Sequence, residues 1–249
     1  MIHYEHYRGN EAFVKRIYDL IELVERRKRT IITPFFSPDQ SALVERIIGK
    51  QLYYVKDGGY EGAERVRFAI CPYEEDTNVN IIALKATYSS SFAKIEHRDV
   101  LGALLNLGLE REKFGDILVK EDEVIIFVDQ DIENYIVCNL VKIKRASVHF
   151  KPYEGEVVYT PKIVYEHKIV SSLRLDVVVA ALANLSRKNA QLYIKSGFVK
   201  VNHVVLEDCS SLCDNNYVIS IRRHGRFHFL EVEKKTKKEH YVISVGKYE

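Results

Sequence analysis

The stretch LRLDVVVAALANLSRKNAQLYIKSG, residues 173–197, decides the fold of the C-terminal third of this chain. Its first half has apolar residues at helical spacing and predicts a helix with a broad buried face: Leu175, Val178, Val179, Leu182 and Leu185. Ser186 is a favourable cap for a second helix, which begins with Arg187 and ends at Gly197. The stretch therefore predicts two consecutive helices.

The second predicted helix carries its polar and basic side chains on one side. On a wheel of about 100° per residue, four of them fall within about 100° of one another: Arg187, Lys188, Gln191 and Lys195. Ala190, Tyr193 and Ile194 occupy a different arc, which can face the core. Phosphate contacts require hydrogen-bond donors and positive charge, and Arg can add a bidentate grip. This helix therefore predicts a face suited to nucleic acid.

Outward from the helices, the sequence predicts short strands at residues 198–201, 204–206 and 217–222. Asn202 and His203 form a tight turn between the first two strands, because Asn tolerates the left-handed conformation that a two-residue hairpin needs. From Lys168 onward there are 14 Lys and Arg against 8 Asp and Glu, a net +6, whereas the preceding 167 residues carry 23 against 27, a net −4. A basic segment attracts phosphate backbones, but a solvated surface explains an asymmetry of this size equally well.

Residues 173–221 also form a longer pattern: Leu173-Arg174-Leu175-Asp176, Leu185-Ser186-Arg187, Ala190, Ile194, Gly197, Val199, Val201-Asn202 and Val218-Ile219-Ser220-Ile221. This pattern resembles the RNA-binding domain first described in ribosomal small-subunit protein four, also called the alpha-L motif. Two departures are visible: Asp214-Asn215-Asn216 replaces a common Gly-Asp turn, and His203 stands where Gly usually follows Asn. Because Asn can replace Gly at positive φ, we expect altered turns and an intact fold.

The N-terminal part predicts two helices and a strand pair. Asn10 is a candidate cap for a helix with one apolar face, formed by Phe13, Ile17, Leu20 and Val24. Ser37, with Pro38 and Gln40, predicts the start of a second helix. Strands are expected at residues 52–55 and 66–70, joined by the glycine-rich segment 58–62. That segment reads either as a structural hairpin loop or as a phosphate-cradling loop.

From residue 80 onward the pattern reads strand, helix, strand, strand, helix, strand, at residues 81–84, 99–107, 117–119, 124–128, 132–141 and 148–150. This order is the ferredoxin-like arrangement, which many RNA-recognition domains share. Such domains read bases with aromatic side chains on the two central strands, and here those strands offer Phe127 alone. His97-Arg98-Asp99 opens the first helix and favours a cap with a surface ion pair over a functional site. A connector is expected from Lys151 to Lys168.

Five further segments occur in a fixed order: Gly58–Arg65, His97–Leu104, Leu107–Asp116, His224–Phe227 and Lys235–Lys238. In sequence and order they resemble the bacterial YlmH family over nearly the whole chain. The resemblance implies an α+β, multi-domain protein: an N-terminal α/β domain at residues 1–75, a ferredoxin-like (RRM-like) domain at 76–165 and an alpha-L RNA-binding domain at 170–249.

The resemblance also implies a role in rescue and quality control of stalled translation. The protein would bind ribosomal RNA and tRNA on the large ribosomal subunit and hold a peptidyl-tRNA while the nascent chain is tailed at its C-terminus. By correspondence to the alpha-L motif, it implies RNA contact by Arg174, Ser186, Arg187, Lys188, Gln191, Lys195, Lys200 and Asn202, with Arg222, Arg223 and Arg226 as additions. For Arg174 the alternative is an ion pair with Asp176.

Several classes of protein have no support in the sequence. We expect no enzyme activity, because no nucleotide-binding glycine motif, His-Glu-x-x-His motif or Ser-His-Asp order is present. We also expect no metal, cofactor or small-molecule substrate, since Cys71, Cys138, Cys209 and Cys213 lack zinc-finger spacing. The chain has no signal-like start or membrane-length apolar run, so a cytoplasmic monomer is expected. A cell-division interaction protein and an RNA-modifying enzyme accessory stay as alternatives.

Overall fold

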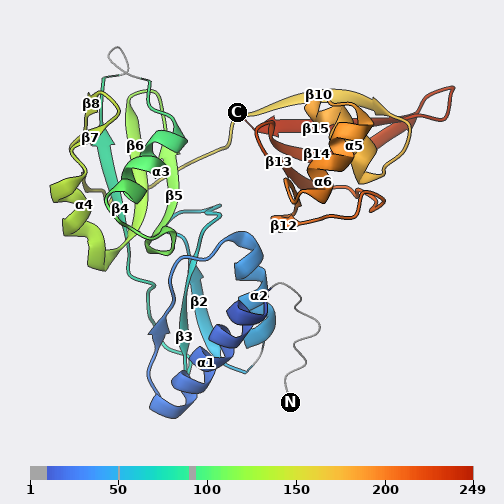
Figure 1. Ribbon diagram of the computed structural model, residues 1–249. Helices are drawn as coiled ribbons and strands as arrows, with labels where there is room; N and C mark the ends of the chain where they lie inside the picture. Colours follow the sequence, from blue (N-terminus) through green and yellow to red (C-terminus); the bar gives the residue numbers. More distant parts are fainter. Residues whose placement is uncertain (1–9, 50, 90–93, 249) are drawn as a thin grey trace. The chain divides into compact units, whose positions relative to one another are not determined.

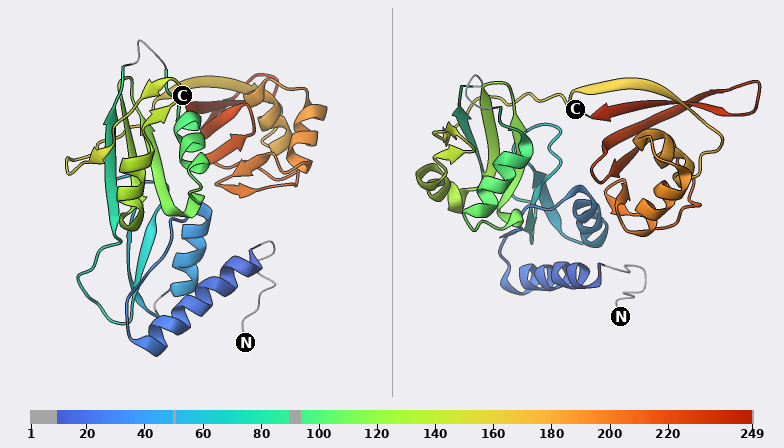
Figure 2. Two further views of the ribbon diagram at one scale, coloured as in Figure 1. Left: turned by 60° about the vertical axis from the view of Figure 1, so that its left-hand side comes forward. Right: turned by 45° about the horizontal axis from the view of Figure 1, so that its top comes forward.

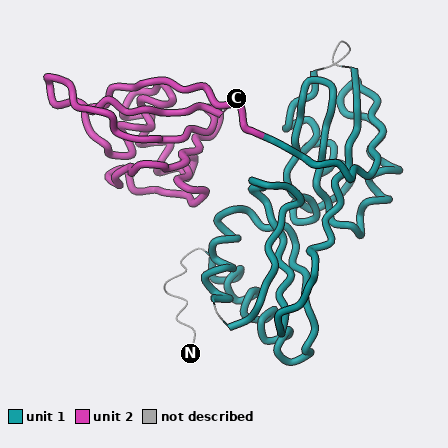
Figure 3. Tube along the Cα trace, turned by 180° about the vertical axis from the view of Figure 1, so that it is seen from behind, with its two compact units in different colours: residues 1–159 teal, residues 160–249 magenta. Residues whose placement is uncertain are grey.

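The computed structural model describes residues 10–49, 51–89 and 94–248, and it divides the chain into two compact units (Figure 3). The N-terminal unit comprises residues 1–159 and the C-terminal unit residues 160–249. Both contain helices and antiparallel sheets, which confirms the predicted α+β class. Within the described ranges, no helix combines the length and the apolar character that crossing a membrane requires.

The first part of the N-terminal unit packs two helices, α1 (Glu11–Arg27) and α2 (Pro38–Ile48), with a small sheet (Figure 1). Its antiparallel strands have the order β1-β3-β2: β1 (Ile31–Ile32), β3 (Arg67–Cys71) and β2 (Tyr53–Asp57). The predicted strand pair is thus confirmed. The backbone N–H of Ser37 donates to Gln40 Oε1 at 3.0 Å, as the helix-start prediction requires. Asn10 occupies the N-cap position of α1 as predicted, although its side chain makes no capping hydrogen bond.

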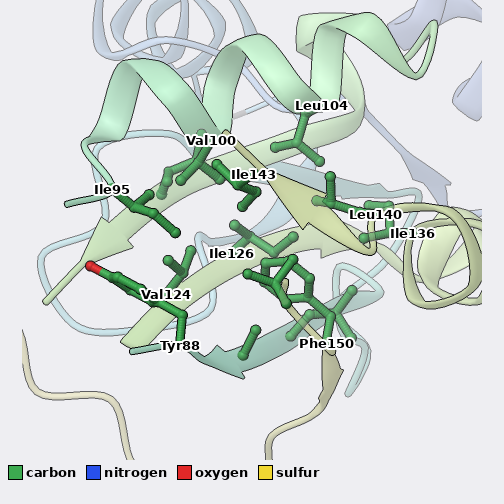
Figure 4. Close-up of a cluster of buried hydrophobic side chains, with 14 of the residues drawn as sticks. Tyr88, Ile95, Val100, Leu104, Val124, Ile126, Ile136, Leu140, Ile143 and Phe150 are labelled. Atoms are coloured by element: carbon green, nitrogen blue, oxygen red, sulfur yellow. The ribbon is translucent and has the colours of Figure 1, made fainter. Parts of the chain in front are cut away.

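The second part of this unit is a four-stranded sheet of order β5-β6-β4-β9, in which all neighbours are antiparallel. Along the chain its elements are β4 (Ile81–Thr87), α3 (His97–Asn106), η2 (Arg111–Lys113), β5 (Phe114–Val119), β6 (Glu123–Asp129), η3 (Gln130–Ile132), α4 (Glu133–Asn139) and β9 (Lys151–Pro152). Figure 4 shows its core, where Val100 and Leu104 of α3 face Ile126 of β6.

The last strand of that sheet lies later than predicted. Residues 148–150 form no strand; Val148 and Phe150 are buried in the core instead, and the sheet pairing falls to Lys151 and Pro152. A short hairpin that the sequence did not predict, β7 (Lys142–Ile143) with β8 (Ala146–Ser147), occupies the chain between α4 and this strand. The strand-like alternation at 148–150 is therefore explained by burial of Val148 and Phe150 on either side of the exposed His149, and not by pairing.

The C-terminal unit places the two predicted helices, α5 (Leu175–Ala183) and α6 (Arg187–Lys195), on one face of a six-stranded antiparallel sheet (Figure 2). The strands have the order β10 (Ile163–Val170), β15 (Tyr241–Tyr248), β14 (Gly225–Lys235), β13 (Tyr217–Ile221), β11 (Val199–Val201) and β12 (Val204–Val205). Between β11 and β12, Asn202 and His203 have φ angles of 48° and 70°, so the predicted left-handed turn is present despite the missing glycine.

The predicted connector from Lys151 to Lys168 was wrong in its second half. Residues 163–170 form β10, which pairs Ile163 with Tyr248 and Val170 with Tyr241 at the far end of the chain. The sequence-based boundaries at residues 165 and 170 consequently fall within this strand, and the C-terminal unit begins at Thr160. Pairing between such distant segments leaves no local pattern for a sequence reading to detect.

Candidate nucleic-acid interface

A fully buried carboxylate, Asp176, organises the basic side chains of α5 and α6. Its Oδ1 accepts a hydrogen bond from Arg174 Nε at 3.2 Å, and its Oδ2 accepts from Arg187 Nε at 2.9 Å and from Gln191 Nε2 at 2.7 Å. Asp176 lies in the first turn of α5, whereas Arg187 and Gln191 are one turn apart on α6. Three of the side chains predicted to contact RNA thus converge on one group.

The electrostatics of Asp176 show that these contacts stabilise its charged form. Burial alone would raise the pKa of the carboxyl, but the hydrogen bonds from Gln191, Arg174 and Arg187 outweigh burial and lower the pKa to about 2. The ion pair that the sequence offered as the alternative for Arg174 is therefore present. Because the side chains of Arg174 and Arg187 are still 39% and 56% exposed, both guanidinium groups also reach solvent.

Helix α6 has the two-sided character that its sequence predicts. Ala190 and Ile194 are buried, whereas Lys188 and Lys195 are exposed. Ser186 caps the helix, since its Oγ accepts a hydrogen bond from the backbone N–H of Asn189 at 3.2 Å. Its predicted contact with RNA remains a prediction, and capping is the role that the structure shows.

Beside the C-terminal end of α6, two more predicted residues lie on a strand or directly after one. Lys200 of β11 and Arg222, directly after β13, line a groove of about 390 Å³ together with Phe198. Asn202 has a structural role, because its Oδ1 accepts from the backbone N–H of Val218 at 2.9 Å. Phe198 was missed by the sequence reading, although an aromatic residue directly after the glycine that ends a basic helix is a signal that could have singled it out.

The remaining two predicted residues lie at the turn into β14. Arg223 is exposed and has a φ of 68°. Arg226 lies over the ring of Tyr248, with 5.2 Å between its guanidinium carbon and the ring centroid. Of the eleven predicted residues, three therefore contact Asp176, two line the groove and two arginines lie at or just before the start of β14. The other four lie at the cap of α6, on its exposed side or in the turn after β11: Ser186, Lys188, Lys195 and Asn202.

In the N-terminal unit, the sheet face that carries Phe127 is covered. Phe127 of β6 is 0% exposed, and the ring of Tyr60 stacks on it with centroids 4.8 Å apart and an interplanar angle of 23°. Tyr60 belongs to the glycine-rich loop between β2 and β3; a Cβ on neighbouring Gly59 would lie 2.5 Å from Phe127 Cδ1. This loop therefore has the structural role that was one of its two interpretations, and it covers Phe127, the aromatic side chain that the sequence offered for base stacking.

Asp116 of β5 fastens this loop to the sheet. Its Oδ2 accepts from Tyr60 Oη at 2.9 Å and from the backbone N–H of Glu64 at 2.7 Å, and its Oδ1 accepts from the backbone N–H of Arg65 at 3.2 Å. The same region also holds Arg111, from the segment that contains Asp116. Its pKa is lowered to about 10, first by burial and then by the nearby guanidinium of Arg65. Residues of the recognised segments 58–65 and 107–116 are thus brought together by one carboxylate.

The segment His97-Arg98-Asp99 has the structural role that the sequence favours. Asp99 Oδ2 accepts from the backbone N–H of Glu96 at 2.8 Å, which closes the first turn of α3. The same carboxylate pairs with Lys144 Nζ at 2.6 Å, and Arg98 pairs with Glu96 at 2.8 Å. Across the described residues, no group of three or more His, Cys, Asp or Glu side chains is placed to hold a metal ion.

Comparison with known proteins identifies the family. The model described as "YlmH, N-terminal" matches residues 9–75, and the one described as "Putative RNA-binding domain in YlmH" matches residues 72–156. Ribosome-associated protein quality control protein P2 of Bacillus subtilis (strain 168) is 32% identical over 248 residues, 97% of this chain and 96% of the relative. A solved structure, cell division protein ylmH from Streptococcus pneumoniae, is 28% identical with a TM-score of 0.52, covering 59% of this chain and 92% of that chain. This chain belongs to the YlmH family.

Proposed function

We propose that this protein binds structured ribosomal and transfer RNA through its C-terminal unit and acts in ribosome-associated quality control without catalysing a reaction. The observation that carries the proposal is the basic surface of α5 and α6, whose arginines are oriented by the buried Asp176. Two comparisons support it: the quality-control name of the Bacillus subtilis relative and the RNA-binding description of the model matched at residues 72–156.

The finer proposal is that the protein, as a cytoplasmic monomer, holds a peptidyl-tRNA on the large ribosomal subunit while a stalled chain is tailed. Support comes from the helix pair and the following hairpin, which have the order of an alpha-L domain. The middle sheet has the strand order and antiparallel pairing of a ferredoxin-like domain, which we propose it to be. Holding an RNA needs positioned donors and charge, and it needs no reactive nucleophile.

The orientation of the arginines explains why this surface suits folded RNA. Arg187 uses its Nε to reach Asp176, so the plane of its guanidinium is fixed and the exposed part of the group faces solvent. Lys188 and Lys195 add exposed charges on the same helix. A donor that is already oriented loses less conformational entropy when it binds a phosphate than a freely rotating one does.

Co-sedimentation with large ribosomal subunits tests the proposal. The double variant Lys188→Glu with Lys195→Glu reverses two exposed charges and leaves the contacts of Asp176 intact. We expect its affinity for the subunits to fall by about tenfold or more, because two phosphate contacts become repulsive. Arg187 is left unchanged, since a glutamate there would face the buried Asp176 and destabilise the fold.

The matched control is Lys15→Glu with Arg26→Glu, which makes the same change of net charge at two exposed positions of α1. The control variant should co-sediment as the wild type does. Equal loss of binding in both variants would show that only net charge matters, and unchanged binding of the Lys188/Lys195 variant would overturn the proposed surface.

A second candidate function is a protein-binding role in cell division, which the name of the solved Streptococcus pneumoniae relative favours. In that case the basic surface of α6 would be incidental. The two functions differ in their response to salt: a grip on phosphates weakens steeply as salt rises, whereas a protein scaffold predicts no steep dependence on the α6 lysines.

A further inference from the structure

The C-terminal sheet has an outer face, defined here by Phe198, Lys200, Ser220, Arg222 and Arg226. Val199, Val201, Ile219 and Ile221 alternate with these residues and are buried against α5 and α6. Lys200 lies opposite Ser220, and Ser220 lies opposite Arg226, so their side chains share one side of the sheet. In the described part of this unit, α5 and α6 pack against the opposite face, and α6 reaches the outer face at Phe198 through the ring of Tyr193.

At one edge of the outer face, an aromatic ring and a guanidinium are stacked. The guanidinium carbon of Arg222 lies 4.7 Å from the ring centroid of Phe198, which is 36% exposed. The edge of Tyr193 supports the ring from α6, with centroids 5.7 Å apart and an interplanar angle of 80°. The backbone N–H of Arg222 also donates to the carbonyl of Phe198 at 2.9 Å. These contacts hold both groups in place.

The groove that this pair lines has the chemistry of a site for a nucleotide. Lys200 and Arg222 line it with Phe198, and none of the described lining residues carries a carboxylate. Its volume of about 390 Å³ lies within the range of small-molecule sites. Flat rings and guanidinium planes are the surfaces on which unpaired bases stack, and a neighbouring lysine can reach the phosphate of the same nucleotide.

We propose that this groove binds an unpaired nucleobase of RNA, stacked on the Phe198–Arg222 pair with Lys200 on its phosphate. The inference rests on the proposed function and deepens it. The basic surface of α6 would hold phosphates whether the RNA is paired or not, whereas the groove takes only a base that has left its helix. The protein would therefore favour RNA that has an unpaired segment beside a folded one.

Two RNA probes distinguish binding in the groove from binding to the surface of α6. One is a short oligouridylate, which is unpaired, and the other is a blunt, fully paired RNA duplex. For Phe198→Ala and for Arg222→Lys, we expect the affinity for oligouridylate to fall at least about fivefold, because stacking is lost. Affinity for the duplex should change little. Arg222→Lys keeps the charge and the fold, so its weaker binding should come with an unchanged dependence on salt.

The control is Tyr165→Ala, which removes a ring that is 63% exposed on β10, the strand at the opposite edge of the same sheet. It should bind both probes as the wild type does. If Phe198→Ala and Arg222→Lys bind oligouridylate as tightly as the wild type, or if the wild type binds only the duplex, the groove proposal is wrong and the proposed function stands. If the wild type binds neither RNA, the proposed function fails and the groove proposal fails with it.

Discussion

Asp176 is the residue on which the arrangement of the proposed RNA-binding surface depends. It has no exposed surface, and it accepts hydrogen bonds from Arg174, Arg187 and Gln191. Removing one partner of a buried ion pair leaves the others without compensation, which typically costs more than the pair contributes. One carboxylate therefore couples the stability of the helix pair to the orientation of its exposed arginines.

The variant Asp176→Asn tests this coupling through pH. The folded pKa of Asp176 is about 2, below its ordinary value of 3.8, so the carboxylate stabilises the fold above pH 4 and this contribution is lost as pH falls towards 2. We expect Asp176→Asn to lower the free energy of unfolding by about 2 kcal/mol at pH 7 and to make unfolding less sensitive to acid between pH 4 and pH 2. Urea unfolding of the C-terminal unit measures both effects.

Asp214→Asn is the matched control, because Asp214 is exposed in the same unit and its carboxylate accepts from the backbone N–H of Asn215, a bond that an amide oxygen can also accept. It should change the free energy of unfolding by less than about 0.5 kcal/mol. An Asp176→Asn variant with wild-type stability at pH 7 would mean that the buried contacts contribute nothing.

Single residues differ in how far the sequence reveals them. Alternation and helical spacing were enough to predict that Lys188, Lys195 and Lys200 are exposed. Asp176 stands within an apolar run, a signal for a buried carboxylate, yet its contacts with α6 depend on how two helices cross. The stack of Arg222 on Phe198 depends on strand pairing in the same way, so a linear reading could not show it.

Among the structural elements, the loop between β2 and β3 has the most consequence for function. Tyr60 stacks on Phe127, and its hydroxyl donates to Asp116. Within the described sheet, Phe127 is the one aromatic residue on the two central strands. Its ring is thus covered by Tyr60 of the same chain. RNA contact by the middle part of the chain would therefore involve another surface or a displaced loop.

Two substitutions of Tyr60 separate the stack from the hydrogen bond. Tyr60→Phe keeps the ring and loses the bond to Asp116, which should cost about 1 kcal/mol of stability. Tyr60→Ala also loses the stack on Phe127 and the buried ring area, and it should cost about 3 kcal/mol. Urea unfolding of the N-terminal unit distinguishes these values.

Tyr53→Ala is the control for those two variants, because Tyr53 is 39% exposed on β2 and belongs to the same part of the chain. Its effect on stability should be small. Equal costs for Tyr60→Phe and Tyr60→Ala would contradict the role given to the stack.

At the scale of elements, local patterns predicted the helices and the hairpins β2–β3, β5–β6 and β11–β12, but they missed the hairpins β7–β8 and β14–β15 and the distant pairing of β10 with β15. The strand pair β2–β3 and the helices α5 and α6 follow from periodicity and capping. Strand β10 was missed because it is largely exposed and carries Glu166, His167 and Lys168 in its middle. Strand β15 was missed although Val242, Ile243 and Val245 are buried, and its pairing with β10 spans the whole C-terminal unit. The strand placed at 148–150 was wrong because the alternate burial of Val148 and Phe150 looks alike in a strand and in an extended loop.

For the whole molecule, the two units make different contributions to the proposed function. Each has its own buried core. The N-terminal unit contains the segments matched by both family models, and the C-terminal unit holds the basic helix pair and the groove. The excess of positive charge in the C-terminal unit agrees with this division, since phosphate contacts need cations and a tightly packed core does not.

The salt dependence of tRNA binding tests most directly whether the basic residues of α6 contact RNA phosphates. Filter binding over a salt series gives a slope whose magnitude counts the cations released from the RNA. Neutralising two exposed lysines of α6, in Lys188→Gln with Lys195→Gln, should lower that slope by about two and weaken binding at every salt concentration. A variant that binds tRNA with the wild-type slope and affinity would contradict the account.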